Sequence, residues 1–264
     1  MSTTLALPPT SAHGTHEIDT PLITATQVIT RLGSYPTITV PMVAGVAPDA
    51  DGIWSFLQEP ADFFDVPMPD LDVLRAALNR FAVATGARDR ALIAATITLV
   101  EIAALPDFVV TGRAVDRVRA TGVRVLGCDA ALHGPGNTDP VWLRMAARTT
   151  SRGPVDQIRR WLNGAGYADG VPAETCVGAP LLGALVFETA GTLVGIDNPE
   201  PTSILDQLEG SGVTNGIRRV DERPAVADRA WWISPEFETH PVVSIDDASY
   251  DVAAEPWPPF LEPR

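Results

Sequence analysis

The chain has 264 residues, of which 45% are hydrophobic and 20% charged, as expected for one large or two small globular domains. Its formal net charge of −14 argues against binding to nucleic acid or an anionic membrane, because both depend on cationic side chains that neutralise phosphates. All 19 basic residues are arginine, whose guanidinium stays protonated and is not nucleophilic, so no side chain can form a Schiff base.

The cysteines and the N-terminus exclude further classes. Cys128 and Cys176 are too few for a disulfide framework, and we interpret both as small buried residues. Neither a CxxC nor an HxxxH spacing occurs, so we predict no metal site. The first residues lack the basic and apolar regions of a signal peptide, and no run of about 18 apolar residues occurs. We therefore expect a cytoplasmic protein.

The first half of the chain is predicted to combine strands with one clear helix. Residues 1–20 are rich in Ser, Thr, Pro and His, and we predict a flexible tail in which His13 and His16 are exposed. Apolar residues recur at helical spacing from Asp70, a plausible N-cap, to Gly86, which ends the helix. The other predictions are a strand over 37–46, no assignment for 47–69, a buried strand over 91–102 and a connection over 106–121.

The second half is predicted to consist mostly of strands. A helix that contains 157–162 stops near 163–166, and a second helix over 202–209 is closed by Gly210. Trp231 and Trp232 lie on opposite faces of a strand, so one of them should be in the core and the other is expected to line a pocket or a subunit interface. The predicted strands cover 123–126, 177–188, 192–196, 216–222, 230–234 and 241–246, with a turn at 190–191.

Four stretches of the second half form an ordered pattern. They are GVRVLG at 122–127, ARTTSRG at 147–153, ALVFETAGTLVG at 184–195, and 218–247 with RRVDERPAVADRAWWIS and HPVVSIDD. In order and spacing they resemble the class IV aminotransferases, the fold-type IV pyridoxal-phosphate enzymes that include branched-chain and D-amino-acid aminotransferases and aminodeoxychorismate lyase. The resemblance implies a two-domain α/β (α+β) fold of the D-amino-acid aminotransferase type. The implied divisions are a flexible tail at 1–20, an N-terminal α/β domain at 21–112, a connection at 113–121 and an aminotransferase-like domain at 122–264.

The chain departs from this family's pattern where the family holds its cofactor. The position of the catalytic lysine is Arg148, or Arg144 in a shifted register. No His-x-x-Arg is available for the cofactor phosphate, and no acid stands at 180–181, where the partner of the pyridine nitrogen is expected. The asparagine of the family's hairpin is Leu185 here. We therefore predict that the chain binds no pyridoxal phosphate.

Arg148 is the first predicted catalytic residue. Its planar guanidinium could enter the old cofactor cavity and bind a carboxylate or a developing oxyanion. Arg144, Thr149 and Thr150 are predicted to bind substrate beside it. The alternatives are a salt bridge to one of the 33 acids, or a solvated basic stripe of Arg144, Arg148 and Arg152 on one helical face.

A hydroxyl pair stands at the start of the second-half helix. Thr202 and Ser203 occupy the place of the family's phosphate-binding turn, and a helix N-terminus can hold an anion through its free N–H groups. Ordinary N-capping by a hydroxyl is the alternative. Ser234 lies where the family has a Thr-Ser pair, and it is a further predicted substrate-binding position.

Glu188 and Tyr167 complete the predicted catalytic set. Glu188 is a potential general base, because burial can raise the pKa of a carboxylate into a useful range, although surface exposure is the alternative. The hydroxyl of Tyr167 is placed in or near the pocket, with its ring against the helix that it follows. Glu174, Asp129 and His133 are further loop candidates.

Three functions stay open at this point. The first is an enzyme that binds a small carboxylate- or phosphate-bearing acid in the old cleft and catalyses a lyase, isomerase or cyclase step without pyridoxal phosphate. The second is an inactive binding or regulatory homologue, favoured if the aromatic segment 54–64 fills the cleft. The third is an aminotransferase or lyase with a noncovalent cofactor. The resemblance also implies a homodimer, because family members complete the cleft with a neighbouring subunit.

Overall fold

The computed structural model describes residues 4–6, 34–86, 91–102, 105–115, 121–128, 139–151, 153–172, 179–199, 201–214 and 216–252. The chain forms two compact units, one of Met1–Val115 with Pro140–Arg152 and one of Asp116–Asp139 with Gly153–Arg264. The tail predicted at 1–20 lies outside the described residues, apart from a short strand at Thr4–Ala6.

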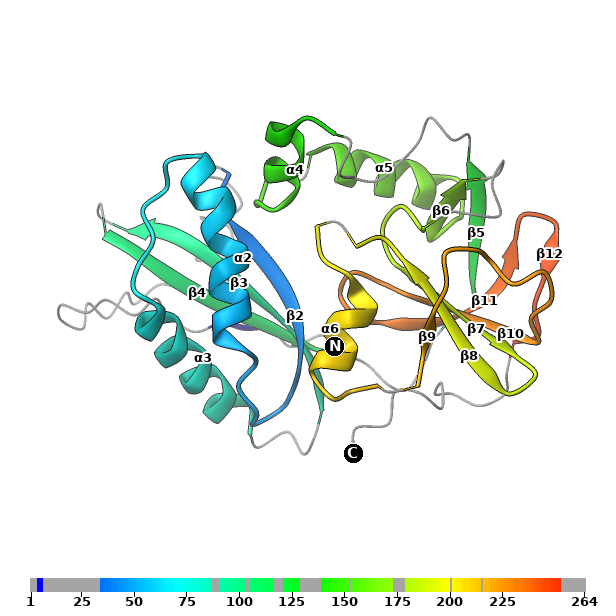
Figure 1. Cartoon of the computed structure of the whole chain (residues 1–264), viewed down its shortest axis with the longest axis horizontal. Coiled ribbons are helices and arrows are strands. Elements are labelled where there is room, and N and C mark those ends of the chain that lie inside the picture. Colours follow the sequence, from blue (N-terminus) through cyan, green and yellow to red (C-terminus); the bar gives the residue numbers. More distant parts are fainter. Residues whose placement is uncertain are drawn as a thin grey trace. The chain divides into compact units, whose positions relative to one another are not determined.

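The first unit contains an antiparallel four-stranded sheet in the order β1-β4-β3-β2 (Figure 1). The strands predicted at 37–46 and 91–102 are confirmed as β2 and β3. The connection predicted over 106–121 is wrong for its first part, because the run FVVTG pairs with β3 as a full strand in which Leu99 lies opposite Phe108. The bounds are β1 (Thr4–Ala6), β2 (Thr37–Val43), β3 (Leu92–Ile102) and β4 (Leu105–Ala114).

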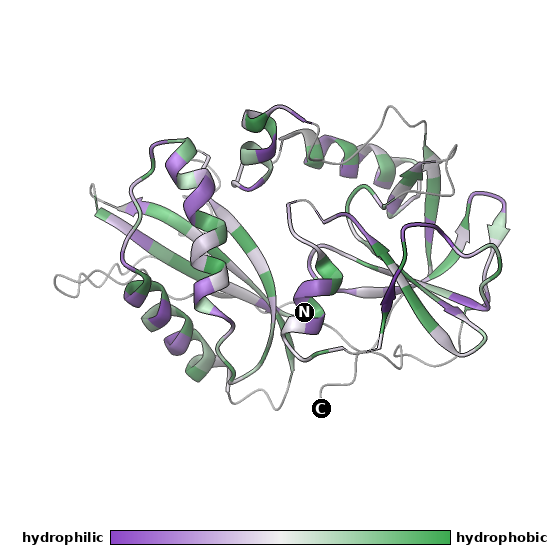
Figure 2. Cartoon of the chain, in the orientation of Figure 1, coloured by the Kyte–Doolittle hydropathy of each residue, from purple (hydrophilic) through white to green (hydrophobic). Residues whose placement is uncertain are grey.

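Two helices pack with this sheet. Helix α3 (Leu71–Thr85) begins after Asp70 and ends at Gly86, as predicted, and Figure 2 shows hydrophobic and hydrophilic residues interspersed along it. Helix α2 (Ala50–Phe63) lies in the segment left unassigned, and the Asp49 carboxylate caps it by accepting from two backbone N–H groups. The ring of Phe81 packs so closely on Gly112 that a Cβ there would lie 2.4 Å from the ring.

The second unit contains an eight-stranded mixed sheet in the order β6-β5-β11-β10-β7-β8-β9, with β12 beside β11 (Figure 1). Parallel pairing joins β5 to β6 and to β11, and also β8 to β9, while the other pairs are antiparallel. The bounds are β5 (Val123–Cys128), β6 (Asp169–Pro172), β7 (Ala184–Thr189), β8 (Thr192–Asp197), β9 (Arg218–Arg219), β10 (Arg229–Ile233), β11 (Thr239–Ile245) and β12 (Ala248–Ser249).

The hairpin of β7 and β8 turns at the predicted residues. Ala190 and Gly191 have φ values of 49° and 74°, the positive values that a two-residue hairpin turn requires. The strands around this hairpin are shorter than predicted, since β7 begins only at Ala184 and β9 covers only Arg218–Arg219. Trp231 and Trp232 are both buried, so neither indole is left on the surface.

Three further helices complete the described structure. Helix α4 (Val141–Ala147) belongs to the first unit, while α5 (Gly153–Gly164) and α6 (Ile204–Gly210) belong to the second. Helices α5 and α6 confirm the two second-half predictions. Among the helices described here, none combines the length and apolar character that a membrane crossing needs.

Candidate functional site

Arg148, the residue at the lysine position, is buried at the end of α4. Its guanidinium forms an ion pair with Glu59 of α2 and donates from Nη2 to the carbonyl of Phe56, at 2.7 Å. Its Cζ atom also lies 3.9 Å from the ring centroid of Phe56. Arg148 therefore forms the salt bridge that was the alternative to a role in the cofactor cavity. A cation–π interaction with Phe56 of the aromatic segment 54–64 reinforces it.

The threonines after Arg148 continue this structural role. The backbone of 148–150 forms a short antiparallel bridge with residues 35–37, in which Thr37 donates to the Arg148 carbonyl and Thr150 to the Tyr35 carbonyl. Thr149 is fully buried, and its hydroxyl donates to Ala146. Two donors are left over: within the described part of the chain, the buried Nε–H groups of Arg144 and Arg148 have no acceptor.

The predicted anion turn before α6 already contains an acid of the chain itself. The carboxylate of Asp197, at the end of β8, accepts from the Ser203 hydroxyl at 2.8 Å and from the Leu205 N–H at 2.9 Å. Burial raises the pKa of Asp197, against the lowering effect of these two donors. Ser203 also caps the helix by accepting from Asp206 N–H. The turn therefore holds a carboxylate where an external phosphate was predicted.

This arrangement predicts unequal roles for the two adjacent hydroxyls. Ser203→Ala is expected to lower the free energy of unfolding by about 1 kcal/mol, because it removes an N-cap and a hydrogen bond to Asp197. Thr202→Ala serves as the matched control, with an expected loss of less than about half that value. Urea unfolding of both variants measures the difference, and equal losses would contradict the capping role of Ser203.

Glu188, the predicted base, lies on β7 opposite Arg229 of β10. Its carboxylate accepts from Arg229 Nη2 at 2.6 Å and from Nε at 2.7 Å, so both donors of one guanidinium edge bind it. Ser234 follows the other end of β10 and is buried, with its Oγ accepting from the N–H groups of Glu236 and Glu238. Ser234 follows Arg229 by five residue steps along an extended strand, which places them roughly 16 Å apart. The structure therefore does not bring Glu188 and Ser234 into one site.

Tyr167 lies just after α5. Its hydroxyl accepts from Arg124 at 3.2 Å, and the Arg124 guanidinium lies over its ring, with Cζ 4.7 Å from the centroid. Its backbone N–H donates to the Leu162 carbonyl of the preceding helix, whereas its ring and hydroxyl contact Arg124. The other loop candidates, Asp129, His133 and Glu174, lie outside the described residues, as does Cys176.

A buried carboxylate that sequence reasoning missed organises the second unit. Asp169 is fully buried at the start of β6, and its two oxygens accept from the N–H groups of Gly170, Leu182 and Gly183 and from the Trp232 indole at 2.8 Å. Burial raises the pKa of Asp169 to about 6, although each of these hydrogen bonds acts in the opposite direction. An Asp-Gly pair before a short strand resembles an ordinary turn, so nothing local in the sequence indicated this role.

Solved structures of known proteins share the fold of this chain. A hypothetical aminotransferase from Mycobacterium tuberculosis superposes with a TM-score of 0.60 at 19% identity, over 86% of each chain. A fold IV-transaminase from Curtobacterium pusillum gives 0.57 at 18% identity, over 86% of this chain and 84% of that one. A putative branched-chain amino acid aminotransferase from Thermotoga maritima gives 0.56 at 13% identity, over 94% and 89%. No family sequence model and no curated protein matches the chain.

The chain has the class IV aminotransferase fold. The fold predicted from the four stretches is thus confirmed.

The prediction that the chain takes no cofactor is corrected by these neighbours. The class IV fold of the M. tuberculosis protein was solved with pyridoxal phosphate and with pyridoxamine phosphate plus α-ketoglutarate, and a Brucella abortus aminotransferase was solved with pyridoxal phosphate. The prediction was drawn from the missing lysine. That inference was wrong, because pyridoxamine phosphate carries its own amine and is held without a covalent bond to the protein. Without the lysine, no covalent bond between the protein and the cofactor can form, but the class IV fold can still hold the cofactor.

Two positions of this chain do not fit the roles that the resemblance gives them. Arg148 has no condensable amine and is held by Glu59 and Phe56. The turn at Ser203 holds the Asp197 carboxylate, which would repel a phosphate in the same place. No reaction step through the cofactor can be derived from these residues.

Proposed function

We propose that this chain is a binding or regulatory homologue with the class IV aminotransferase fold, and that it carries out no transamination that depends on a lysine. The observation that carries the proposal is the set of contacts around Arg148. A catalytic group must be free to reach the reacting atom, whereas this guanidinium is buried in an ion pair, a backbone hydrogen bond and an aromatic stack.

The aromatic segment supports the same proposal. Phe56 and Glu59 both belong to the segment 54–64, whose filling of the site was the feature expected of a binding homologue. The other predicted catalytic side chains are also engaged, Glu188 by Arg229 and Tyr167 by Arg124. The homodimer implied by the resemblance is part of the proposal, since a regulatory homologue would act through such an interface.

An activity assay with added cofactor tests the proposal. The purified chain is mixed with pyridoxal or pyridoxamine phosphate, a panel of amino acids and a panel of 2-oxo acids, and product amino acids are measured by mass spectrometry. We expect turnover no higher than that of heat-denatured protein, and no pyridoxyl adduct on any side chain after borohydride reduction. Saturable turnover with pyridoxamine phosphate would overturn the proposal and favour a noncovalent aminotransferase.

A comparison variant makes this negative result informative. Arg148→Lys combined with Glu59→Gln supplies an amine and removes the acid that would pair with it. We expect this double variant to form a borohydride-reducible adduct with pyridoxal phosphate at position 148, which shows that the assay detects an aldimine. The single variant Glu59→Gln has no amine and is the matched control.

A second function has one observation in its favour. The buried Nε–H groups of Arg144 and Arg148 have no acceptor in the described residues, and they could donate to the carboxylate of a small organic acid undergoing proton transfer. Arg148→Ala discriminates the two functions if such a substrate is found. Loss of turnover in a variant that thermal unfolding shows to be folded would support the enzyme, and unchanged turnover would remove Arg148 from its site.

A further inference from the structure

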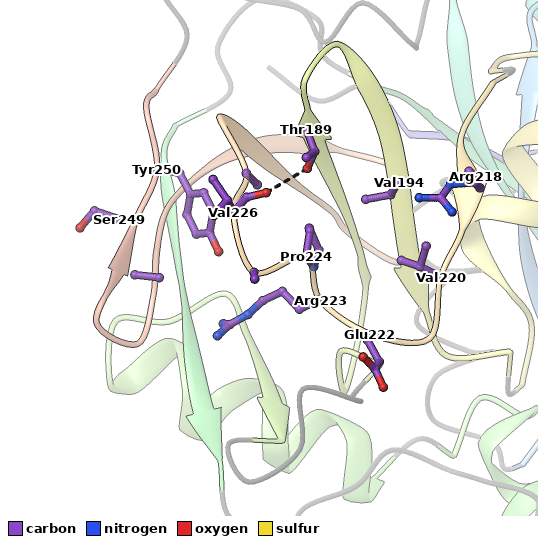
Figure 3. A pocket seen from close by; sticks show the side chains of 13 residues that line it. Thr189, Val194, Arg218, Val220, Glu222, Arg223, Pro224, Val226, Ser249 and Tyr250 are labelled. Carbon is purple, nitrogen blue, oxygen red and sulfur yellow. Dashed lines mark hydrogen bonds between the residues drawn. The ribbon is translucent and has the colours of Figure 1, made fainter.

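The second unit contains a pocket that none of the predicted site residues lines (Figure 3). Its walls come from the β7–β8 hairpin, the chain from β9 to β10, and β12 with the residue that follows it. The cavity is about 670 Å³, within the roughly 300–1,000 Å³ of small-molecule sites. It is therefore large enough for a metabolite-sized ligand.

The charged groups of this pocket favour an anion. Arg218 and Arg223 line it, and no ion pair is formed by either within the described part of the chain. Glu222 is the one acid among the described lining residues, and Figure 3 shows its carboxylate directed away from both guanidinium groups. Because the chain has a net charge of −14, two arginines without ion-pair partners in one cavity differ from the acidic character of the chain as a whole.

Apart from Thr189 and Ser249, the rest of the lining is mostly apolar and includes an aromatic ring. Val194, Val220 and Val226 contribute aliphatic surface. Tyr250 lies with its ring centroid 6.1 Å from that of Phe187, and Figure 3 shows its hydroxyl pointing toward the side occupied by Arg223. Burial raises the pKa of Tyr250 while the nearby Arg223 lowers it, so the phenol is neutral and can donate to an anion.

The segment that forms the pocket wall is fixed at both ends. Val220 N–H donates to the Gly195 carbonyl at 3.1 Å, and Asp228 N–H donates to the Glu188 carbonyl at 2.8 Å. Between them, the Thr189 hydroxyl donates to the Val226 carbonyl at 3.1 Å (Figure 3). The wall therefore exists before a ligand arrives, which reduces the entropy cost of binding.

We propose that this pocket binds a small organic anion, with a carboxylate or phosphate held by Arg223 and the Tyr250 hydroxyl at one end and an apolar or aromatic body against Val226, while Arg218 lies at the other end (Figure 3). Arginine suits this role because its planar fork binds either anion through two parallel hydrogen bonds. The site is independent of the function proposed above, since none of the residues around Arg148 takes part.

Isothermal titration of the full chain in low-salt buffer tests the site with three probes of one shape. Benzoate is the anion, benzamide the neutral analogue and benzamidine the cation, and phenyl phosphate is compared with benzoate to distinguish the two anion types. We expect saturable binding of at least one anion, about tenfold or more tighter than benzamide, with an affinity that falls as NaCl is added. Benzoate and phenyl phosphate that bind no better than benzamide, or not at all, would overturn the proposal.

Three variants locate the binding. Arg223→Gln is expected to weaken the anion about tenfold, because it removes a charge-assisted hydrogen bond. Arg218→Gln, at the other end of the pocket, is expected to weaken it less (Figure 3). Arg160→Gln, at an exposed position on α5 of the same unit, changes the net charge equally and is expected to leave the affinity unchanged. All three positions accept a polar side chain without repacking, and thermal unfolding confirms that the variants are folded. Equal weakening by all three variants, or no weakening by Arg223→Gln, would contradict the assignment.

Discussion

Asp169→Asn is expected to lower the free energy of unfolding by about 2–4 kcal/mol at pH 8, where the native carboxylate is ionised. In the native chain Oδ1 accepts from Gly170 and Leu182, while Oδ2 accepts from Gly183 and Trp232. An amide replaces one of these oxygens with an NH₂ group that can only donate. The two buried N–H groups that bonded to the replaced oxygen would then face the amide's own N–H groups and lose their acceptor. Each buried donor left without an acceptor costs about 1–3 kcal/mol.

The magnitude matters because globular domains are stable by only about 5–15 kcal/mol in total. The carboxylate joins the start of β6 to the segment before β7 and to the indole on β10, so its loss should loosen all three. The backbone at Gly183 cannot move closer to compensate for the lost hydrogen bonds, because it is already packed against Trp232. A Cβ added at Gly183 would lie 2.4 Å from the Trp232 Nε1 atom.

Urea unfolding measures the stability change, and amide hydrogen exchange at Leu182 and Gly183 locates it. Asp251→Asn, at an exposed position of the same unit, is the matched control and should change neither quantity. A loss below about 1 kcal/mol for Asp169→Asn, or unchanged exchange at both amides, would show that the four hydrogen bonds do not organise this unit.

Arg148→Met is expected to destabilise the first unit by about 2–3 kcal/mol. The substitution keeps much of the aliphatic volume but removes the hydrogen bond to the Phe56 carbonyl, the ion pair with Glu59 and the cation–π contact. The Glu59 side chain is 60% exposed, so the ion pair itself should supply only about 1 kcal/mol of this loss. The remainder comes from the part-buried Phe56 carbonyl that loses its donor and from the aromatic contact.

A double-mutant cycle separates these contributions. Glu59→Gln alone should cost less than Arg148→Met, and the double variant should differ from the sum by about 1 kcal/mol, the coupling energy of the pair. Arg75→Met is the control, because Arg75 also bridges to α2 through Asp51 but is exposed and should matter little. If Arg148→Met proves neutral, the guanidinium is not a structural element, and a role in ligand binding becomes the better account of its burial.

Local sequence patterns were sufficient for much of the fold. The helical spacing between Asp70 and Gly86 and the β-branched runs of β2 and β3 determine their elements because each buries one continuous apolar surface. The turn at Ala190–Gly191 was predictable for a similar reason, since two adjacent strands joined by two residues leave few backbone choices. The order of the four family-like stretches then indicated the class IV fold.

Other elements depended on contacts that no local pattern contains. Helix α2 was unassigned because Pro60 and several aromatics obscure its periodicity, although Asp49 and its apolar face stabilise it. Strand β4 was read as a connection because its charged and small residues hide a ten-residue pairing with β3. In both cases tertiary contacts outweighed a weak local preference for a helix or a strand.

The sequence by itself determined that the chain has no lysine, and hence no side-chain amine with which an aldehyde cofactor could condense. Only the tertiary structure decided what occupies the positions left behind, because the partners lie far apart along the chain. Glu59 and Phe56 hold Arg148 from 89 and 92 residues away, and Trp232 reaches Asp169 across 63. A buried charged group needs a partner, and the tertiary fold decides which residue that partner is. The spacing of residues along the sequence therefore does not reveal it.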